Sequence, residues 1–197
     1  MTDDNAIRLI EPCRRLRDGF IEYAEEFKRA GEPFVHGDLD SARANFPALL
    51  QAWRDWSAGR NLRPDHVPES RYWLVRGIRI LGTTRLRHRL SPALRDFGGH
   101  IGYEVRPSER GEGHATRMLA MLLVRARARG LVRVMLTCDQ DNPASARVME
   151  KNGGWCFSEA SSERQGTPVY RYWIDLTGPP AAGPASIGQH PLRGPQP

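Results

Sequence analysis

The segment from Gly102 to Ala115 constrains the fold of this chain more than any other stretch. It runs from a strand-like pattern through a turn that contains Gly111 and Gly113 into a long apolar-periodic stretch. Apolar residues that recur at intervals of three and four predict a helix over about 114–129, directly behind the turn. Glycines let a ligand approach the backbone closely, and a helix N-terminus adds unpaired N–H groups and a partial positive charge. This pattern is typical of a phosphate-binding site, and it also fits a tight turn that binds no ligand.

Two familiar nucleotide-binding classes do not fit the same segment. The turn lacks the lysine of a nucleoside-triphosphate loop, and it lacks the three-glycine fingerprint of a dinucleotide-binding fold. If the turn binds phosphate, it therefore belongs to another class of phosphate site.

The rest of the chain predicts a layered mixed α/β domain. Helices are predicted over about 14–29, 40–58, 114–129 and 142–153, and strands over 7–10, 71–75, 78–87, 99–105, 132–136, 155–157 and 169–176. Two helices after a first strand, then a meander, then alternating strands and helices indicate one α/β domain over residues 1–176. Residues 177–197 are rich in Pro, Gly and Ala, which predicts a disordered tail.

Composition argues against several classes of protein. No run of about 18 apolar residues is present, and the polar N-terminus lacks the features of a signal peptide, so we expect a cytoplasmic protein with no membrane partner. The net charge of +6 comes from arginines scattered along the chain, so no nucleic-acid partner is expected, although arginines can attract an anionic cofactor. The cysteines, Cys13, Cys138 and Cys156, lack metal-ligand spacing; we expect reduced thiols and no metal.

Two motifs give the chain a resemblance to a known family. Arg110-x-x-Gly113-x-Ala115 is similar to the Q/R-x-x-G-x-G/A signature of the GNAT (Gcn5-related N-acetyltransferase) superfamily. The stretch from Asn142 to Gly153 resembles that family's N-x-x-A/S…E-K-x-G segment, and the two motifs occur in the family's order and separation. The resemblance covers about residues 71–176. Within the family, the chain looks like a member of a bacterial subgroup of predicted acetyltransferases.

The resemblance implies the GNAT acyl-CoA N-acyltransferase fold, a mixed central sheet flanked by helices. In this fold two parallel strands, here those ending at Val105 and Cys138, splay apart around the thioester of acetyl-CoA. Backbone groups near Tyr103 would pair with the pantetheine arm and polarise the thioester carbonyl, while the turn amides would hold the pyrophosphate. The implied cofactor-binding residues are Tyr103, Val105, Arg110, Gly111, Glu112, Gly113, His114, Ala115, Asn142 and Ser145.

The catalytic groups are less well defined by the resemblance. Many family members carry a tyrosine seven residues after the asparagine, as the acid that protonates the leaving thiolate, whereas this chain has Met149 there. Ser145 and Cys138 are alternative acids, and a thiolate can also leave without one. The expected general base is Glu104 or His100, which share one face of a strand, although each also fits an ordinary structural side chain.

The acceptor site is expected from the N-terminal helices and the loop at residues 59–69. The candidate acceptor-binding residues are Trp73, Phe34, His36 and Asp139, and each aromatic also fits a core position. We expect direct acetyl transfer from acetyl-CoA to a primary amine of a small molecule, by analogy an amino sugar or an aminoglycoside-type antibiotic. A protein N-terminal or lysine acetyltransferase and a non-catalytic acyl-CoA sensor are the alternatives, and a homodimer stays open.

Overall fold

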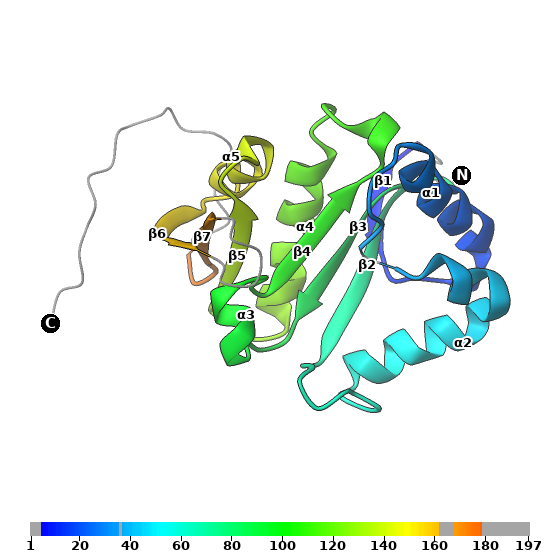
Figure 1. The fold of residues 1–197 in the computed structure, drawn as a ribbon, viewed down its shortest axis with the longest axis horizontal. Coiled ribbons are helices and arrows are strands. Elements are labelled where there is room, and N and C mark those ends of the chain that lie inside the picture. Colours follow the sequence, from blue (N-terminus) through cyan, green and yellow to red (C-terminus); the bar gives the residue numbers. More distant parts are fainter. Residues whose placement is uncertain (1–4, 36, 162–167, 179–197) are drawn as a thin grey trace, which may run out of the picture.

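The computed structural model describes residues 5–35, 37–161 and 168–178 (Figure 1). Its elements in chain order are β1 (Ile7–Ile10), α1 (Arg17–Arg29), α2 (Leu39–Ser57), β2 (Glu69–Arg76), β3 (Arg79–Arg87), α3 (Pro92–Asp96), β4 (Ile101–Val105), α4 (His114–Ala128), β5 (Arg133–Asp139), α5 (Pro143–Lys151), β6 (Trp155–Ser161) and β7 (Pro168–Asp175). The mixed α/β architecture predicted from the sequence is confirmed. The tail predicted over 177–197 lies outside the described residues except for its first two positions.

The strands form two antiparallel sheets that meet at β4 and β5. One sheet has the order β1-β2-β3-β4 and the other the order β5-β7-β6. His100 N donates to Met135 O at 2.7 Å where the two sheets join. Gly99 adopts a φ of +61° at this junction, and a Cβ added there would lie 2.3 Å from Met135 O. Glycine is therefore required for β4 and β5 to come this close, and beyond this point they belong to separate sheets (Figure 1).

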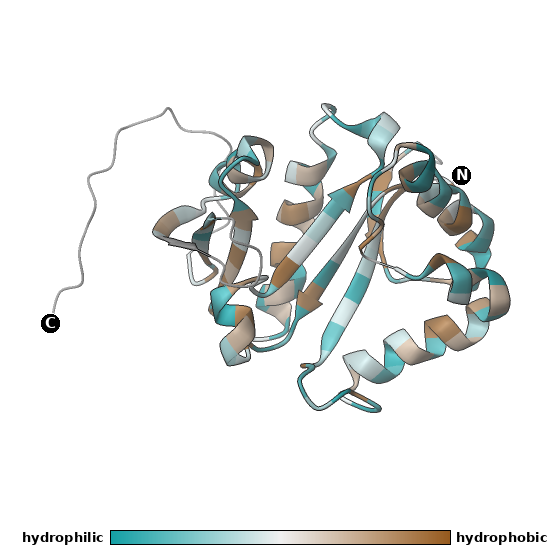
Figure 2. Cartoon of the chain, in the orientation of Figure 1, coloured by the Kyte–Doolittle hydropathy of each residue, from teal (hydrophilic) through white to brown (hydrophobic). Residues whose placement is uncertain are grey.

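Helices cover the two faces of the four-stranded sheet. On one face, α4 buries a stripe of apolar residues against the strands, among them Met118, Leu119 and Leu122. On the other face, α1 and α2 enclose an aromatic core with residues of β2 and β3. Figure 2 shows hydrophobic segments on these helices and on the strands between them. The apolar spacing of three and four that predicts α1 and α4 is thus the spacing that places their apolar faces on the sheet.

One short helix was not predicted. Residues 88–98 read as a plain connection, whereas the structure forms α3 there. Ser91 caps α3 by accepting a hydrogen bond from Leu94 N at 3.4 Å, and Pro92 occupies its first turn. A serine followed by a proline is a common start of a helix, so the sequence could have predicted α3.

Candidate active site

One edge of β4 faces the gap between β4 and β5, and of its outward backbone groups Val105 O accepts from Arg110 Nε at 3.3 Å. Arg106, just past the end of β4, donates its N–H to Leu81 O of β3 at 2.9 Å. Only alternate residues bond across an antiparallel pair, so the N–H and C=O groups of Tyr103 and Val105 face away from β3. Within the part of the chain that the structure describes, no strand pairs with this edge. An extended ligand can therefore add to β4 as a further strand would.

The turn between β4 and α4 has the geometry of a phosphate site. Gly111 and Gly113 have φ values of +84° and +75°, and a Cβ added at either would meet no heavy atom within 4 Å. The space over their amides is therefore open. Gly113 is the N-cap of α4, and the first N–H groups of a helix have no partner within it. These open amides at the positive end of a helix fit a diphosphate.

Two residues predicted to bind the cofactor use their side chains elsewhere. The His114 ring is buried, and its Nε2 lies 3.4 Å from Glu109 Oε2. The Arg110 guanidinium makes a two-pronged ion pair with Glu32, with N–O distances of 2.8 and 2.6 Å. That hydrogen-bonded pair lowers the pKa of Glu32 and raises the pKa of Arg110. Both residues can therefore serve a phosphate mainly through their backbone.

A buried arginine anchors the turn to α1. Arg106 is fully buried, and its Nε and Nη2 donate to Glu26 Oε2 and Glu22 Oε1, each at 2.7 Å. Glu26 also accepts the backbone N–H of Ser108 at 2.8 Å. Burial acts to raise the pKa of Glu26, but the bonds from Ser108 and Arg106 outweigh it and lower that pKa to about 2. The turn is thus fixed on the N-terminal helix by charge-assisted hydrogen bonds.

The carboxylate of Glu104 lies on the face of β4 opposite α4, at the N-terminal helices. Thr83 Oγ1 donates to its Oε1 at 3.1 Å, and Val35 N donates to its Oε2 at 3.3 Å. Tyr23 of α1 donates to the backbone oxygen of Glu104 at 3.2 Å. The structure therefore brings Glu104 together with the loop that carries Phe34, whose half-buried ring packs on the aromatic core.

His100 shares the strand face of Glu104 but lies at the junction of the sheets. Four residues of a strand span roughly 13 Å, so the two candidate bases are far apart. His100 Nδ1 accepts from Met135 N at 2.9 Å. Burial, together with the charges of Arg87 and Arg95, lowers the pKa of His100 to about 4. The geometry therefore favours Glu104 over His100 as a base beside the free edge of β4.

The side chain of Tyr103 crosses the gap from β4 to α5. Its hydroxyl donates to the backbone oxygen of Ser145 at 3.3 Å. Burial raises the pKa of Tyr103 to about 12, so the hydroxyl keeps its proton at neutral pH. Met149, which stands where the family has its tyrosine, is only 1% exposed within the core. Sequence reasoning assigned only the backbone of Tyr103, although a tyrosine facing the helix that lacks one is a readable signal.

The remaining predicted residues divide between the gap and the core. Asn142 caps α5 through its Oδ1, which accepts from Ser145 N at 3.0 Å. Cys138 is buried, and burial raises the pKa of its thiol to about 11. Asp139 ends β5 at the open side of the gap and is half-buried.

The structure corrects one predicted acceptor-binding residue, and another falls outside its described part. The prediction for Trp73 is wrong: the ring is 1% exposed and stacks on Phe20 with centroids 5.2 Å apart, so it belongs to the core. His36 lies outside the described residues.

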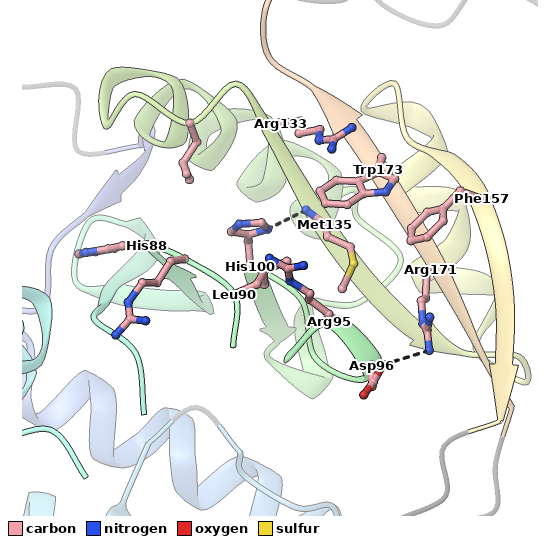
Figure 3. A pocket seen from close by; sticks show the side chains of 12 residues that line it. His88, Leu90, Arg95, Asp96, His100, Arg133, Met135, Phe157, Arg171 and Trp173 are labelled. Atoms are coloured by element: carbon pink, nitrogen blue, oxygen red, sulfur yellow. Dashed lines mark hydrogen bonds and ion pairs between the residues drawn. The ribbon is translucent and has the colours of Figure 1, made fainter. Parts of the chain in front are cut away.

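A cavity of about 560 Å³ opens beside His100, on the side of β5 opposite α4 (Figure 3). Its walls come from the segment between β3 and β4 and from β5, β6 and β7. Phe157 and Trp173 form an aromatic wall, with ring centroids 5.6 Å apart. Sequence reasoning did not find this cavity, because its walls come from four separate parts of the chain.

Among the residues described by the structure, no helix has both the length and the apolar character needed to cross a membrane. Within the same residues, no group of three or more His, Cys, Asp or Glu side chains is placed to hold a metal ion.

A family model described as an acetyltransferase (GNAT) domain matches residues 20–154. No curated protein matches the chain in sequence. Similar solved structures include RimJ of Mycobacterium smegmatis in complex with CoA-disulfide, with a TM-score of 0.64 and 18% identity over 88% of this chain and 83% of that one. The ribosomal-protein-S5-alanine acetyltransferase from Vibrio fischeri has a TM-score of 0.63 and 17% identity, over 87% of this chain and 92% of that one. A chimera of the spermidine N-acetyltransferase SpeG from Vibrio cholerae and hSSAT has a TM-score of 0.57 and 14% identity, over 87% and 96%.

Proposed function

Because this chain belongs to the GNAT acetyltransferase family, we propose that it moves the acetyl group of acetyl-CoA to a primary amine of a small molecule by direct attack. The chain is an acetyl-CoA-dependent N-acetyltransferase; the class of acceptor and the catalytic residues are the proposal. One observation carries the proposed chemistry: a carboxylate, Glu104, is held by Thr83 and Val35 beside the free edge of β4.

Glu104 is proposed as the general base. Acetyl-CoA supplies a thioester carbonyl that an amine can attack once the amine has lost its proton. Glu104 would accept that proton, directly or through one water, and the backbone N–H of Tyr103 would donate to the thioester oxygen. Glu104 suits this role because it lies on the face opposite α4 while its backbone neighbours form the edge that would bind pantetheine.

Tyr103 is proposed as the proton donor to the leaving sulfur. Its hydroxyl reaches the first turn of α5, at Ser145, and remains protonated at neutral pH because burial raises its pKa to about 12. Met149 cannot fill this role, since a thioether carries no proton. A tyrosine presented by β4 would thus replace the one that the family often carries on the helix. Ser145 is the alternative donor.

The size of the cavity beside His100 supports a small-molecule acceptor. Its volume of about 560 Å³ falls within the usual range for small-ligand sites, roughly 300–1,000 Å³. A protein N-terminus or a polyamine is the alternative acceptor, since similar structures are named for ribosomal-protein and spermidine acetylation. Those proteins share less than a fifth of their residues with this chain, so their acceptors do not decide the question.

Two sequence-based expectations, an aminoglycoside acceptor and a non-catalytic acyl-CoA sensor, are disfavoured. An aminoglycoside is a polycation, and the arginines around the cavity give that expectation no support. A non-catalytic acyl-CoA sensor is disfavoured, because the family is one of enzymes and Thr83 holds the Glu104 carboxylate in place. The single domain over residues 1–176, the cytoplasmic location and the homodimer stay predictions.

The test is an acceptor screen. The protein is incubated with acetyl-CoA and a panel of amines, amino sugars, polyamines and N-terminal peptides, and released thiol and acetylated product are both measured. A small amine should be acetylated, and Glu104→Gln should lower kcat by at least about a hundredfold while Glu11→Gln, an exposed carboxylate outside the site, should not. Efficient acetylation of peptides alone would contradict the small-molecule proposal.

A further inference from the structure

Positive charge dominates the cavity beside His100. Four arginines line it, namely Arg89, Arg95, Arg133 and Arg171, together with the single carboxylate of Asp96. The Asp96 side chain is 77% exposed, and its Oδ1 lies 3.7 Å from Arg171 Nη2 (Figure 3). An ion pair this long and exposed neutralises little of the charge. The cavity therefore presents a cationic field to any molecule that enters it.

Donors at the cavity are left for a ligand. Arg171 Nε is buried and has no hydrogen-bond partner among the described residues. His100 Nδ1 accepts from Met135 N, so the neutral ring carries its proton on Nε2, its remaining donor. A buried N–H without an acceptor is costly, and a ligand oxygen would remove that cost. A carboxylate or a phosphate carries several acceptor oxygens and can therefore accept hydrogen bonds from these donors.

An aromatic wall completes the cavity. The Arg133 guanidinium lies 4.5 Å from the centroid of the Trp173 ring, and the Phe157 ring stacks on the same tryptophan. Stacking on a ring holds a guanidinium in a fixed place while its N–H groups stay available. The wall offers apolar surface for a carbon skeleton, and the arginines offer charge for its end.

The cavity and Glu104 lie on one face of β4. His100, Gly102 and Glu104 alternate onto that face, and Gly102 between them carries no side chain. Opposite Gly102 on β3 stands Arg85, whose Nε is buried and, among the described residues, unpartnered. A molecule bound in the cavity can therefore extend along this face toward the carboxylate, over a span of roughly 13 Å between the outer two Cα atoms.

We infer that the acceptor is an amine that also carries an anionic group, a carboxylate or a phosphate, and that the arginine-lined cavity beside His100 binds this group while the amine reaches Glu104. The inference rests on the proposed function and names the acceptor class for the same site. It favours acceptors whose charge lies several bonds from the amine. Polycationic acceptors are disfavoured by the same arginines.

The experiment uses three linear acceptors that differ at one end: aminohexanoate, aminohexyl phosphate and aminohexanol. Each has the same terminal amine and chain length, and only the first two carry an anion. We expect kcat/KM for at least one anionic acceptor to exceed that for the alcohol by tenfold or more, mainly through KM. Comparison of the two anions distinguishes a carboxylate site from a phosphate site.

Variants tie the preference to the cavity. Arg95→Gln and Arg133→Gln, alone and combined, should raise KM for the anionic acceptor and leave KM for aminohexanol unchanged. Arg133→Lys, which keeps the charge, should retain most of the preference. Arg8→Gln, at an exposed position of the edge strand β1, is the matched control for a general loss of positive charge.

Direct binding separates this inference from the proposed function. The protein is first saturated with CoA, which occupies the turn between β4 and α4. Calorimetry should then show that aminohexyl phosphate or aminohexanoate binds, and that this binding is at least tenfold weaker in the variant that combines Arg95→Gln and Arg133→Gln. Equal kcat/KM for all three acceptors, or unchanged anion binding in the folded double variant, overturns the inference and leaves acetyl transfer intact. Anion binding at the cavity without acetylation of any amine would instead count against the proposed function alone.

Discussion

Arg106 and Glu26, which are 80 positions apart in the sequence, form a 2.7 Å hydrogen-bonded ion pair at the base of the turn between β4 and α4. The guanidinium is fully buried, and its other nitrogens bond to Glu22 and to Ile80 O. The same Glu26 carboxylate accepts the N–H of Ser108. The amides that would bind phosphate are therefore held in place by a helix from the other end of the domain.

Replacement of Arg106 by methionine should destabilise the protein strongly. The methionine keeps the volume but leaves Glu26 with its Ser108 bond alone. Removal of one partner from a fully buried pair costs about 3–5 kcal/mol, and the loss here should lie below that range because the Glu26 side chain is 17% exposed to water. Urea unfolding should show this loss, while Arg8→Met should change the midpoint little. Any folded fraction of Arg106→Met should bind CoA more weakly, and undiminished affinity would argue that the anchor does not position the turn.

Stability should fall in acid because of Glu26. Its folded pKa is about 2 and its ordinary value is 4.5, so between these values the unfolded state binds more protons than the folded state. The stabilisation is therefore complete above about 4.5 and is lost as the pH falls toward 2. Urea midpoints measured across this window should drop less steeply in Glu26→Gln than in the unchanged protein. Parallel curves would show that other carboxyls carry the effect.

Gly113→Val should weaken acetyl-CoA binding by at least tenfold, about 1.4 kcal/mol. The valine would strain a backbone with φ of +75° and project over amides that a diphosphate needs. Gly130→Val is a matched control, because Gly130 has a φ of +85° and equally open surroundings at the other end of α4. Both variants should lose stability, but only Gly113→Val should lose affinity by calorimetry.

Glu104→Gln and His100→Gln should have different effects. Loss of the base oxygen in Glu104→Gln should lower kcat by at least about a hundredfold with acetyl-CoA affinity preserved. His100→Gln should mainly raise KM for an anionic acceptor, since His100 lines the cavity. Because the pKa of His100 is about 4, it should give no ascending limb near 6.5 in the pH–rate profile. A large kcat loss in His100→Gln alone would reverse the assignment.

Tyr103→Phe should lower kcat at least tenfold without weakening CoA binding, if its hydroxyl protonates the leaving sulfur. The raised pKa of about 12 implies that no descending limb from Tyr103 should appear below pH values near 10. Tyr170→Phe, a half-buried tyrosine on β7, serves as the control. A second measurement uses thioesters with more acidic leaving thiols, for which the loss in Tyr103→Phe should shrink.

Features set by neighbours in the sequence were predictable, and features set by distant pairings were not. The α4 helix and the turn at Gly111 and Gly113 follow from local apolar spacing and glycine conformation, and the structure forms both. The burial of Arg106 depends on a helix 80 positions away, and an arginine before a proline carries no local sign of it. Trp73 was placed in the acceptor site because aromatic residues suit both cores and binding sites.

The cavity also depends on distant pairings and could not be predicted from the sequence. Its arginines looked scattered in the sequence, and the fold gathers four of them around one space. Strand alternation predicts that Arg133 and Met135 share a face, as do Arg171 and Trp173, but not that these two pairs meet. Their meeting depends on the register of β5 with β7, which pairs Met135 with Trp173.

The ion pair of Arg110 with Glu32 has a consequence for how this enzyme can be redesigned. Glu32 begins the loop whose Val35 N–H holds Glu104, and Arg110 begins the turn that would bind the pyrophosphate. A loop grafted from another enzyme to change acceptor choice would remove Glu32 and release Arg110. A change in this loop is therefore expected to alter both the choice of acceptor and the affinity for acetyl-CoA. A graft that retains Glu32 is expected to change the acceptor while it leaves the affinity for acetyl-CoA intact.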